Sequence, residues 1–340
     1  MSLKDLESVA RAIVAAKKGI LAADESTSTI GKRFAAIKVE STEDTRRRYR
    51  ELLFTTPKAA EYVSGVILYD ETIRQKTREG VAFPEYLNRN GIIPGIKVDT
   101  GAKDLAGFPG EKVTEGLDGL RERLAEYYKL GARFAKWRAV ITIGNGIPTR
   151  TSITSNAHAL ARYAALCQEA NIVPIVEPEV LMDADNTIER CEEVTSETLR
   201  TVYDALAHHR VLLEGTLLKP NMVIAGKKCP QQANVQQVAE ATVRCLRRCV
   251  PAAVPGIVFL SGGQSEQLAT EHLNYMSTLG PHPWPLSFSY GRALQESALK
   301  AWGGQESRFA AGQKEFYKRA RLNGLARSGG YKPAMEAEAA

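Results

Sequence analysis

The sequence predicts a closed (β/α)8 barrel, a TIM barrel, formed as a single domain by the whole chain of 340 residues. Eight short apolar, β-branched runs recur along the chain, and a helical pattern follows each of them. Eight strands that alternate with helices over about 270 residues are typical of this barrel, and a doubly wound open sheet is the alternative. No linker divides the chain, and its length is within the range of such barrels.

The eight runs end in polar or glycine-rich residues. In chain order they cover residues 19–24, 64–70, 93–99, 134–140, 173–180, 212–221, 256–263 and 285–291. Between them, apolar residues recur at helical spacing, as Leu117, Leu120 and Leu124 do before the C-terminal stop at Gly131. After about residue 325 the chain is small, polar and alanine-rich, so we expect residues 325–340 to form a mobile tail.

The charge of the chain favours a small anionic substrate. The formal net charge is +6, but lysine and arginine are scattered among acidic residues, so no nucleic-acid partner is expected. The densest basic run, residues 46–50, follows a capped helix start and is interpreted as a solvated helix face. No signal peptide and no run of about 18 apolar residues is present, so no membrane contact is expected. Five cysteines without CxxC spacing indicate reduced thiols and a cytoplasmic protein.

Charged residues stand where buried strands should be apolar, because an unpaired buried charge costs several kcal/mol. They occur near the ends of five runs: Asp24, Lys97, Asp99, Lys136, Arg138, Glu177, Glu179 and Lys219. In a barrel, the C-terminal ends of all strands meet at one mouth, so these side chains should converge there. A layer of ion pairs is the alternative for any one of them. The whole set favours an active site.

The types of residue at the strand ends indicate lysine chemistry. None of the five histidines belongs to a strand end, so no metal site is expected. The remaining strong nucleophile is a lysine amine, which forms a Schiff base with a carbonyl once its pKa has fallen from about 10.4. Lys219, between Leu218 and Pro220, is the candidate, with Lys136 as the neighbouring cation that lowers such a pKa. Glu177 and Glu179 are candidates for proton transfer, and Asp24 is a second base.

Two segments are candidates for phosphate binding. The sequence LSGGQS ends the seventh run, and SYGRAL places Gly291 and Arg292 at a helix start after the eighth run. Phosphate sites after strands seven and eight recur in barrels, although SGG is also compatible with a plain turn. The second candidate is STSTIGKR, which follows Asp24 and contains Ser26, Thr29 and Arg33.

Seven segments together resemble class I fructose-bisphosphate aldolase: GILAADES, GIKVD, AKWR, VPIVEPE, LEGTLLKPN, FLSGGQS and SYGRALQ. The resemblance runs from about Gly19 to Gly304. It implies a (β/α)8 barrel that reversibly cleaves fructose 1,6-bisphosphate to dihydroxyacetone phosphate and glyceraldehyde 3-phosphate. It also implies no metal or other cofactor, a homotetramer, and a place in glycolysis and gluconeogenesis.

The resemblance assigns roles by motif. Lys219 matches the Schiff-base lysine and Glu177 the principal acid/base, Glu179 assists, Lys136 tunes the nucleophile, and Asp24 is the base for carbon-carbon cleavage. The ketose phosphate site corresponds to Ser261, Gly262, Gly263, Ser289 and Arg292, and the opposite phosphate end to Lys97, Arg138, Ser26, Thr29 and Arg33.

The chain departs from the family pattern at two places. Ser28 stands where many members have glycine, which predicts a stiffer phosphate loop. The best-known animal and plant members end in a tyrosine that helps proton exchange, whereas this chain ends at Ala340. Either the role is lost, or Tyr331 or the tail supplies it.

Two other functions remain as alternatives. A transaldolase-like Schiff-base enzyme would act on another ketose phosphate, but the two phosphate sites argue against it. A non-catalytic barrel scaffold is the other alternative, since a fold does not imply a function. Against this, neither the nucleophile nor a base is missing.

Overall fold

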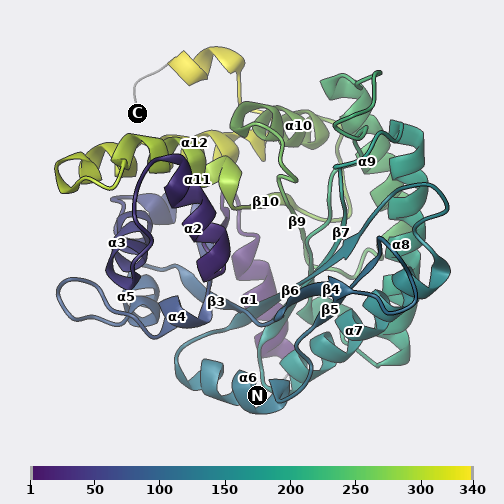
Figure 1. Cartoon of the computed structure of the whole chain (residues 1–340), viewed down its shortest axis with the longest axis horizontal. Helices are drawn as coiled ribbons and strands as arrows, with labels where there is room; N and C mark the ends of the chain where they lie inside the picture. The colour runs from purple at the N-terminus through teal and green to yellow at the C-terminus, as the bar shows by residue number, and fades with distance from the viewer. Residues whose placement is uncertain (1–2, 338–340) are drawn as a thin grey trace.

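A closed barrel of eight parallel strands surrounded by helices forms the centre of the protein (Figure 1). The computed structural model describes residues 3–337. Around the barrel the strands follow the order β1-β10-β9-β8-β7-β6-β3-β2, and β1 pairs with both β2 and β10. The predicted TIM barrel is therefore confirmed, and the open sheet is excluded because neither end of the strand order is free.

All eight predicted runs contribute one barrel strand each. The barrel strands are β1 (Gly19–Ala22), β2 (Val63–Leu68), β3 (Ile93–Lys97), β6 (Phe134–Ile141), β7 (Val173–Val180), β8 (Leu217–Leu218), β9 (Ile257–Phe259) and β10 (Leu286–Tyr290). The helices are α1 (Leu3–Ile13), α2 (Thr27–Ala36), α3 (Glu43–Phe54), α4 (Asp70–Ile73), α5 (Phe83–Arg89), α6 (Leu120–Lys129), α7 (Arg150–Glu169), α8 (Ile188–His208), α9 (Val235–Cys249), α10 (Glu266–Thr278), α11 (Arg292–Trp302) and α12 (Phe309–Ala326).

The sixth strand is much shorter than its predicted run of residues 212–221. Leu213–Gly215 form a 3-10 turn instead, and only Leu217 and Leu218 belong to β8. Pro220 has no N–H to donate, which limits the ladder beyond this point. The last donor, the Lys219 N–H, bonds the Val176 carbonyl at 2.8 Å and so fixes the Lys219 backbone against β7.

A hairpin outside the barrel was not predicted. Its strands β4 (Gly101–Asp104) and β5 (Lys112–Glu115) pair antiparallel. Both strands are short and carry several charged residues, so a search for apolar runs misses them. Gly116, at φ +126°, follows β5 at the open end of the hairpin, where a Cβ would lie 2.9 Å from the Thr100 nitrogen.

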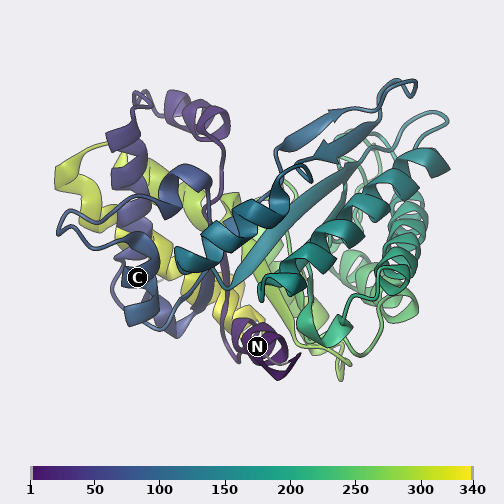
Figure 2. The ribbon, with the colours of Figure 1, turned by 90° about the horizontal axis from the view of Figure 1, so that it is seen from below.

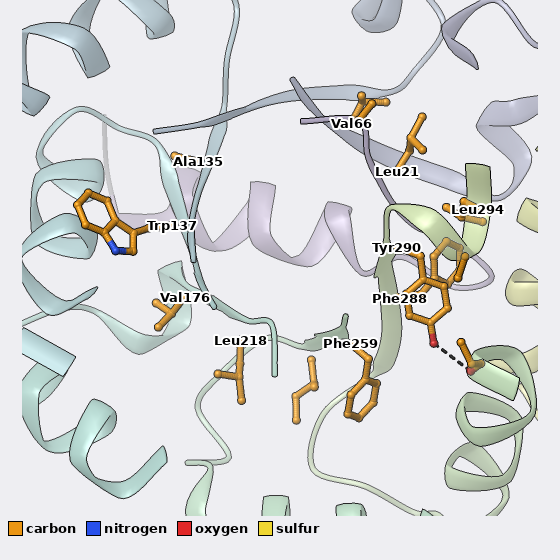
Figure 3. Close-up of a cluster of buried hydrophobic side chains, with 14 of the residues drawn as sticks. Leu21, Val66, Ala135, Trp137, Val176, Leu218, Phe259, Phe288, Tyr290 and Leu294 are labelled. Carbon is orange, nitrogen blue, oxygen red and sulfur yellow. Dashed lines mark hydrogen bonds between the residues drawn. The ribbon is translucent and has the colours of Figure 1, made fainter. Parts of the chain in front are cut away.

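Alternation along the strands separates two apolar regions. Figure 3 shows outward-facing side chains such as Trp137, Val176 and Leu218 in the layer between the strands and the helices. The inward-facing residues at the N-terminal half of the barrel form a second cluster, which includes Phe134 and Ile175. Further along the same inward faces, the apolar residues give way to charged ones.

The two ends of the barrel differ. Helix α1 packs into the inner apolar cluster through Leu6, Ala10 and Ile13 and covers one end. Figure 2 shows α1 at this end, with α2 and the β4–β5 hairpin at the opposite one. The second end is the mouth, where the C-terminal ends of the strands meet.

The predicted mobile tail overlaps a packed segment. Residues 333–337 form a 3-10 helix, and Tyr331 is buried. The Tyr331 hydroxyl donates to Glu336 at 2.9 Å, and Arg319 pairs with Glu336 at 2.6 Å. Residues 338–340 lie outside the described part, and mobility of the tail stays a prediction.

Two further sequence expectations concern cysteines and membranes. All five cysteines are buried and unpaired. Between residues 3 and 337, no helix is long and apolar enough to cross a membrane.

Candidate active site

The mouth of the barrel holds a cavity of about 1200 Å³. All fifteen predicted site residues line it, although they come from seven separate stretches of the chain. This convergence follows from the parallel barrel, in which inward-facing residues at every C-terminal strand end face the same space. The structure thus brings together all predicted residues, and their individual roles stay predictions.

A chain of buried ion pairs occupies the centre of the mouth. Lys219 Nζ lies 3.1 Å from Glu177 Oε1, and Lys136 Nζ lies 3.4 Å from Glu177 Oε2. Lys136 Nζ also lies 2.7 Å from Asp24 Oδ2. The side chains of the two lysines and of Glu177 are at most 5 % exposed. Glu177 therefore stands between two amines in a region from which most water is excluded.

Two members of this chain, Lys136 and Asp24, are held in their charged forms. Burial disfavours the charge on Lys136, but attraction to Asp24 and Glu177 outweighs it and raises the pKa of Lys136. Burial alone would raise the pKa of Asp24, but the charges of Lys136 and Lys219 outweigh it and hold that pKa well below the usual 3.8. Lys136 is a permanent cation and Asp24 a permanent anion near neutral pH.

Two further ion pairs lie beside this chain of ion pairs. Arg138, two residues beyond Lys136 and therefore on the same face of β6, pairs with Glu179 through its Nε. Lys97 lies 2.7 Å from Asp99, whose other oxygen accepts from the Arg138 backbone at 3.2 Å. Asp99 was recognised as a strand-end charge but given no role, and it fixes both Lys97 and the β6 backbone.

One side of the mouth is built to receive an anion. Gly262 and Gly263 follow β9 with φ of +57° and +81°, a left-handed conformation that favours glycine. The Ser289 hydroxyl on β10 is buried and has no hydrogen-bond partner among the described residues. Gly291 and Arg292 open α11, so this hydroxyl, the glycine loop and a helix start surround one position.

The opposite side is formed by the start of α2. Ser26 caps the helix by accepting from the Thr29 N–H, and its hydroxyl lies 3.1 Å from those of Ser28 and Thr29. Arg33, two turns along the helix, forms an ion pair with Glu25. This side therefore presents hydroxyls and one guanidinium.

Glu25 was missed at this end, although it follows Asp24 directly in the sequence. Its second oxygen lies 2.8 Å from Arg50, and both side chains are buried. Glu25 thus joins Arg33 to the body of the protein. The prediction that residues 46–50 form a solvated helix face is wrong, because α3 packs this run against the protein. Tyr49 and Arg50 are buried, and the other three arginines are ion-paired and at most 23% exposed.

Tyr331 lies elsewhere. Its hydroxyl and backbone bond to Glu336 and Asn274, and it is absent from the described lining of the cavity. In this arrangement Tyr331 does not take the role of the family's terminal tyrosine. Lys227 lines the mouth without having been predicted, because it lies in a loop beyond the strand end.

The arrangement supports imine chemistry on a substrate with two anionic ends. A buried lysine amine beside a carboxylate can add to a ketone and lose water, with the carboxylate moving the protons. Within residues 3–337, no group of three or more histidine, cysteine and acidic side chains could hold a metal ion.

Comparison with known proteins gives one consistent result. A family model described as fructose-bisphosphate aldolase class-I matches residues 5–340. The chain is 62% identical to the "Probable fructose-bisphosphate aldolase class 1" of Xanthomonas axonopodis pv. citri, over 98% of this chain and 100% of the relative. It is 57% identical to "Fructose-bisphosphate aldolase 4, cytosolic" of Arabidopsis thaliana, over 93% and 80%. Among solved structures, it is similar to fructose-bisphosphate aldolase from Plasmodium falciparum, with a TM-score of 0.96, 52% identity, and 97% and 95% coverage.

Proposed function

The chain belongs to the class I fructose-bisphosphate aldolase family, and we propose that Lys219 is the amine with which it forms its Schiff base. The enzyme is a lyase that reversibly cleaves fructose 1,6-bisphosphate to dihydroxyacetone phosphate and glyceraldehyde 3-phosphate. The observation that carries the assignment of Lys219 is its burial at 3.1 Å from Glu177, within a cavity lined by anion-binding groups at two ends.

Lys219 attacks the ketone carbon of the substrate to give a carbinolamine. Its amine must be neutral to do so, and the Glu177 carboxylate, 3.1 Å away, is within reach to take its proton. Glu177 first takes the proton of the Lys219 ammonium. After the attack, one proton moves from the nitrogen to the former carbonyl oxygen, and Glu177 returns its own proton to the resulting hydroxyl, which leaves as water. The product is an iminium ion that can accept an electron pair.

Carbon-carbon cleavage then needs a base. Asp24 accepts the proton of the C4 hydroxyl, the C4 carbonyl forms, and the electrons of the C3–C4 bond move into the iminium to give an enamine. Its depressed pKa keeps Asp24 ionised and able to accept this proton. Protonation of the enamine at C3 and hydrolysis of the imine release dihydroxyacetone phosphate.

The two phosphates have separate sites in this proposal. Ser261, Gly262, Gly263, Ser289 and Arg292 bind the ketose phosphate. Lys97, Arg138, Ser26, Thr29 and Arg33 bind the opposite end, and Glu179 supports the acid/base group. The buried Ser289 hydroxyl, which has no hydrogen-bond partner among the described residues, could donate a hydrogen bond to a phosphate oxygen.

Borohydride trapping with dihydroxyacetone phosphate tests the assignment directly. Reduction converts an imine to a stable amine, so mass spectrometry should find the adduct on the peptide that contains Lys219. Lys219→Ala should fold normally, form no adduct and lose cleavage. An adduct on another lysine, or substantial cleavage by Lys219→Ala, would refute the assignment.

We further propose that the protein is a cytoplasmic homotetramer. The name of the Arabidopsis relative, which includes the word cytosolic, supports the location. The tetramer is inferred from the family resemblance. Light scattering of the purified enzyme should give four times the chain mass of 37.2 kDa, and a monomer at micromolar concentration would contradict it.

A further inference from the structure

We propose that Lys227 is a specificity-determining residue that, together with Arg292, clamps the ketose phosphate over Gly263. This inference rests on the proposed function, in which Gly263 and Arg292 belong to the ketose phosphate site. Lys227 follows Lys219 by eight residues and lies outside every strand-end motif, so no pattern in the sequence points to it.

The backbone around Lys227 fixes its position at the mouth. The Lys227 N–H donates to the Met182 carbonyl at 2.8 Å, and the preceding Gly226 N–H donates to the Asn186 carbonyl at 2.8 Å. A Cβ at Gly226 would lie 2.2 Å from the Ala184 carbonyl oxygen, so only glycine allows the two loops to approach this closely. The loop that carries Lys227 is thus held against the segment that follows β7.

The side chain then reaches the glycine loop. A Cβ built on Gly263 would lie 2.8 Å from Lys227 Nζ and 2.8 Å from Arg292 Nη2. The two cationic nitrogens are therefore no more than twice that distance apart, and both lie against Gly263. Like charges at such a separation repel each other, and an anion placed between them would bind to both.

The groups beside these cations suit a phosphate. Gly262 and Gly263 have positive φ, a conformation in which successive backbone N–H groups can turn toward an anion. Gly263 has no side chain, and any Cβ there would fill the space between the two cations. A phosphate group carries enough charge and acceptor oxygens to bond Lys227, Arg292 and the loop together.

Lys227 has a competing partner in the free enzyme. Its ammonium lies 3.1 Å from Asp183, and both side chains are well exposed, at 43% and 67%. An exposed pair of this kind is weak and exchanges readily. Arg292 forms no ion pair within residues 3–337. Substrate phosphate therefore has to displace only a weak contact to recruit Lys227.

The test titrates dihydroxyacetone phosphate against trapping of the Lys219 imine in wild type and Lys227→Met. Loss of one charge-assisted contact at a half-exposed site should raise the half-saturating concentration about tenfold. The kcat for cleavage of saturating fructose 1,6-bisphosphate should stay within about twofold, because Lys227 contacts no reacting atom in this proposal. Lys227→Arg should restore tight binding, and competition by inorganic phosphate should weaken in Lys227→Met.

Lys228→Met is the matched control. This neighbouring residue carries the same charge change but does not line the described cavity, so half-saturation should equal that of wild type. Asp183→Asn should lower half-saturation in the wild-type background and have no effect on Lys227→Met. An equal effect of Asp183→Asn in both backgrounds would overturn the competition between Asp183 and phosphate.

Failure of this inference is distinct from failure of the proposed function. If wild type forms no adduct on Lys219, the proposed function fails. If all variants form the adduct and Lys227→Met saturates at the same concentration as wild type and Lys228→Met, only the role of Lys227 is overturned.

Discussion

Replacing Glu177 by glutamine changes one charge at the centre of the ion-pair chain. The amide has nearly the same shape as the carboxylate, so the cavity is preserved. It cannot take the proton that Lys219 loses, nor return it to the carbinolamine hydroxyl. We expect formation of the Schiff base to become slow while substrate still binds.

The size of the effect follows from the loss of proton transfer. At 3.1 Å from Lys219, the Glu177 carboxylate is within direct hydrogen-bond reach of the amine. Loss of a positioned general acid/base typically slows a step by about 10² to 10⁴-fold, which corresponds to about 3–5 kcal/mol in the barrier. We therefore expect imine formation to slow within this range.

A single-turnover measurement separates this step from product release. Enzyme in excess is mixed with dihydroxyacetone phosphate, portions are quenched with borohydride over time, and the adduct on Lys219 is quantified by mass spectrometry. Glu179→Gln is the matched control, because Glu179 pairs with Arg138 and not with the lysines. It should slow the same step less than tenfold.

Two results would refute the reasoning. Imine formation at the wild-type rate in Glu177→Gln would show that this carboxylate is not the acid/base group. Equal slowing by the two substitutions would show that the site responds to its total charge and not to the contact with Lys219. Because removing one member of a buried ion group costs about 3–5 kcal/mol of stability, the assay is run well below the melting temperature.

Three further predictions follow from the same geometry. Asp24→Asn should still form the Schiff base with dihydroxyacetone phosphate but lose cleavage of fructose 1,6-bisphosphate, and a variant that still cleaves at the wild-type rate would exclude Asp24 as the base. Because the pKa of Asp24 is depressed, its carboxylate stabilises the fold above pH 3.8, and this stabilisation is lost as pH falls toward the folded-state pKa. In urea unfolding, the stability advantage of wild type over Asp24→Asn should therefore shrink on acidification. An advantage that grew on acidification would contradict the pairing of Asp24 with Lys136. EDTA should leave cleavage unchanged, and inhibition that zinc reverses would overturn the metal-free mechanism.

The sequence by itself determined the barrel. Strand identity depends on local runs of apolar residues, and eight such runs with intervening helices leave few ways to bury them all. The lysines and acids at the strand ends could also be recognised in the sequence, because a charged residue within an apolar run is unusual. The parallel topology then implied that these residues converge.

Features without a local signal needed the tertiary structure. The β4–β5 hairpin has polar strands, and contacts outside its own sequence hold it, such as those of Thr114 with Arg138 and Asn156. Arg50 belongs to a basic run whose composition is typical of a solvated face, and it is buried because α3 packs it against Glu25.

The arrangement of charges was likewise decided by the fold. The sequence indicated that Lys136 and Lys219 lie near acidic residues. It did not indicate that Glu177 lies between the two lysines, or that Asp24 pairs with Lys136 and not with Lys219. Lys227 reaches the mouth because a glycine lets two loops meet across a sequence separation of more than forty residues. Such contacts depend on distances that no run or spacing along the chain encodes, since they are set by how the loops pack above the barrel.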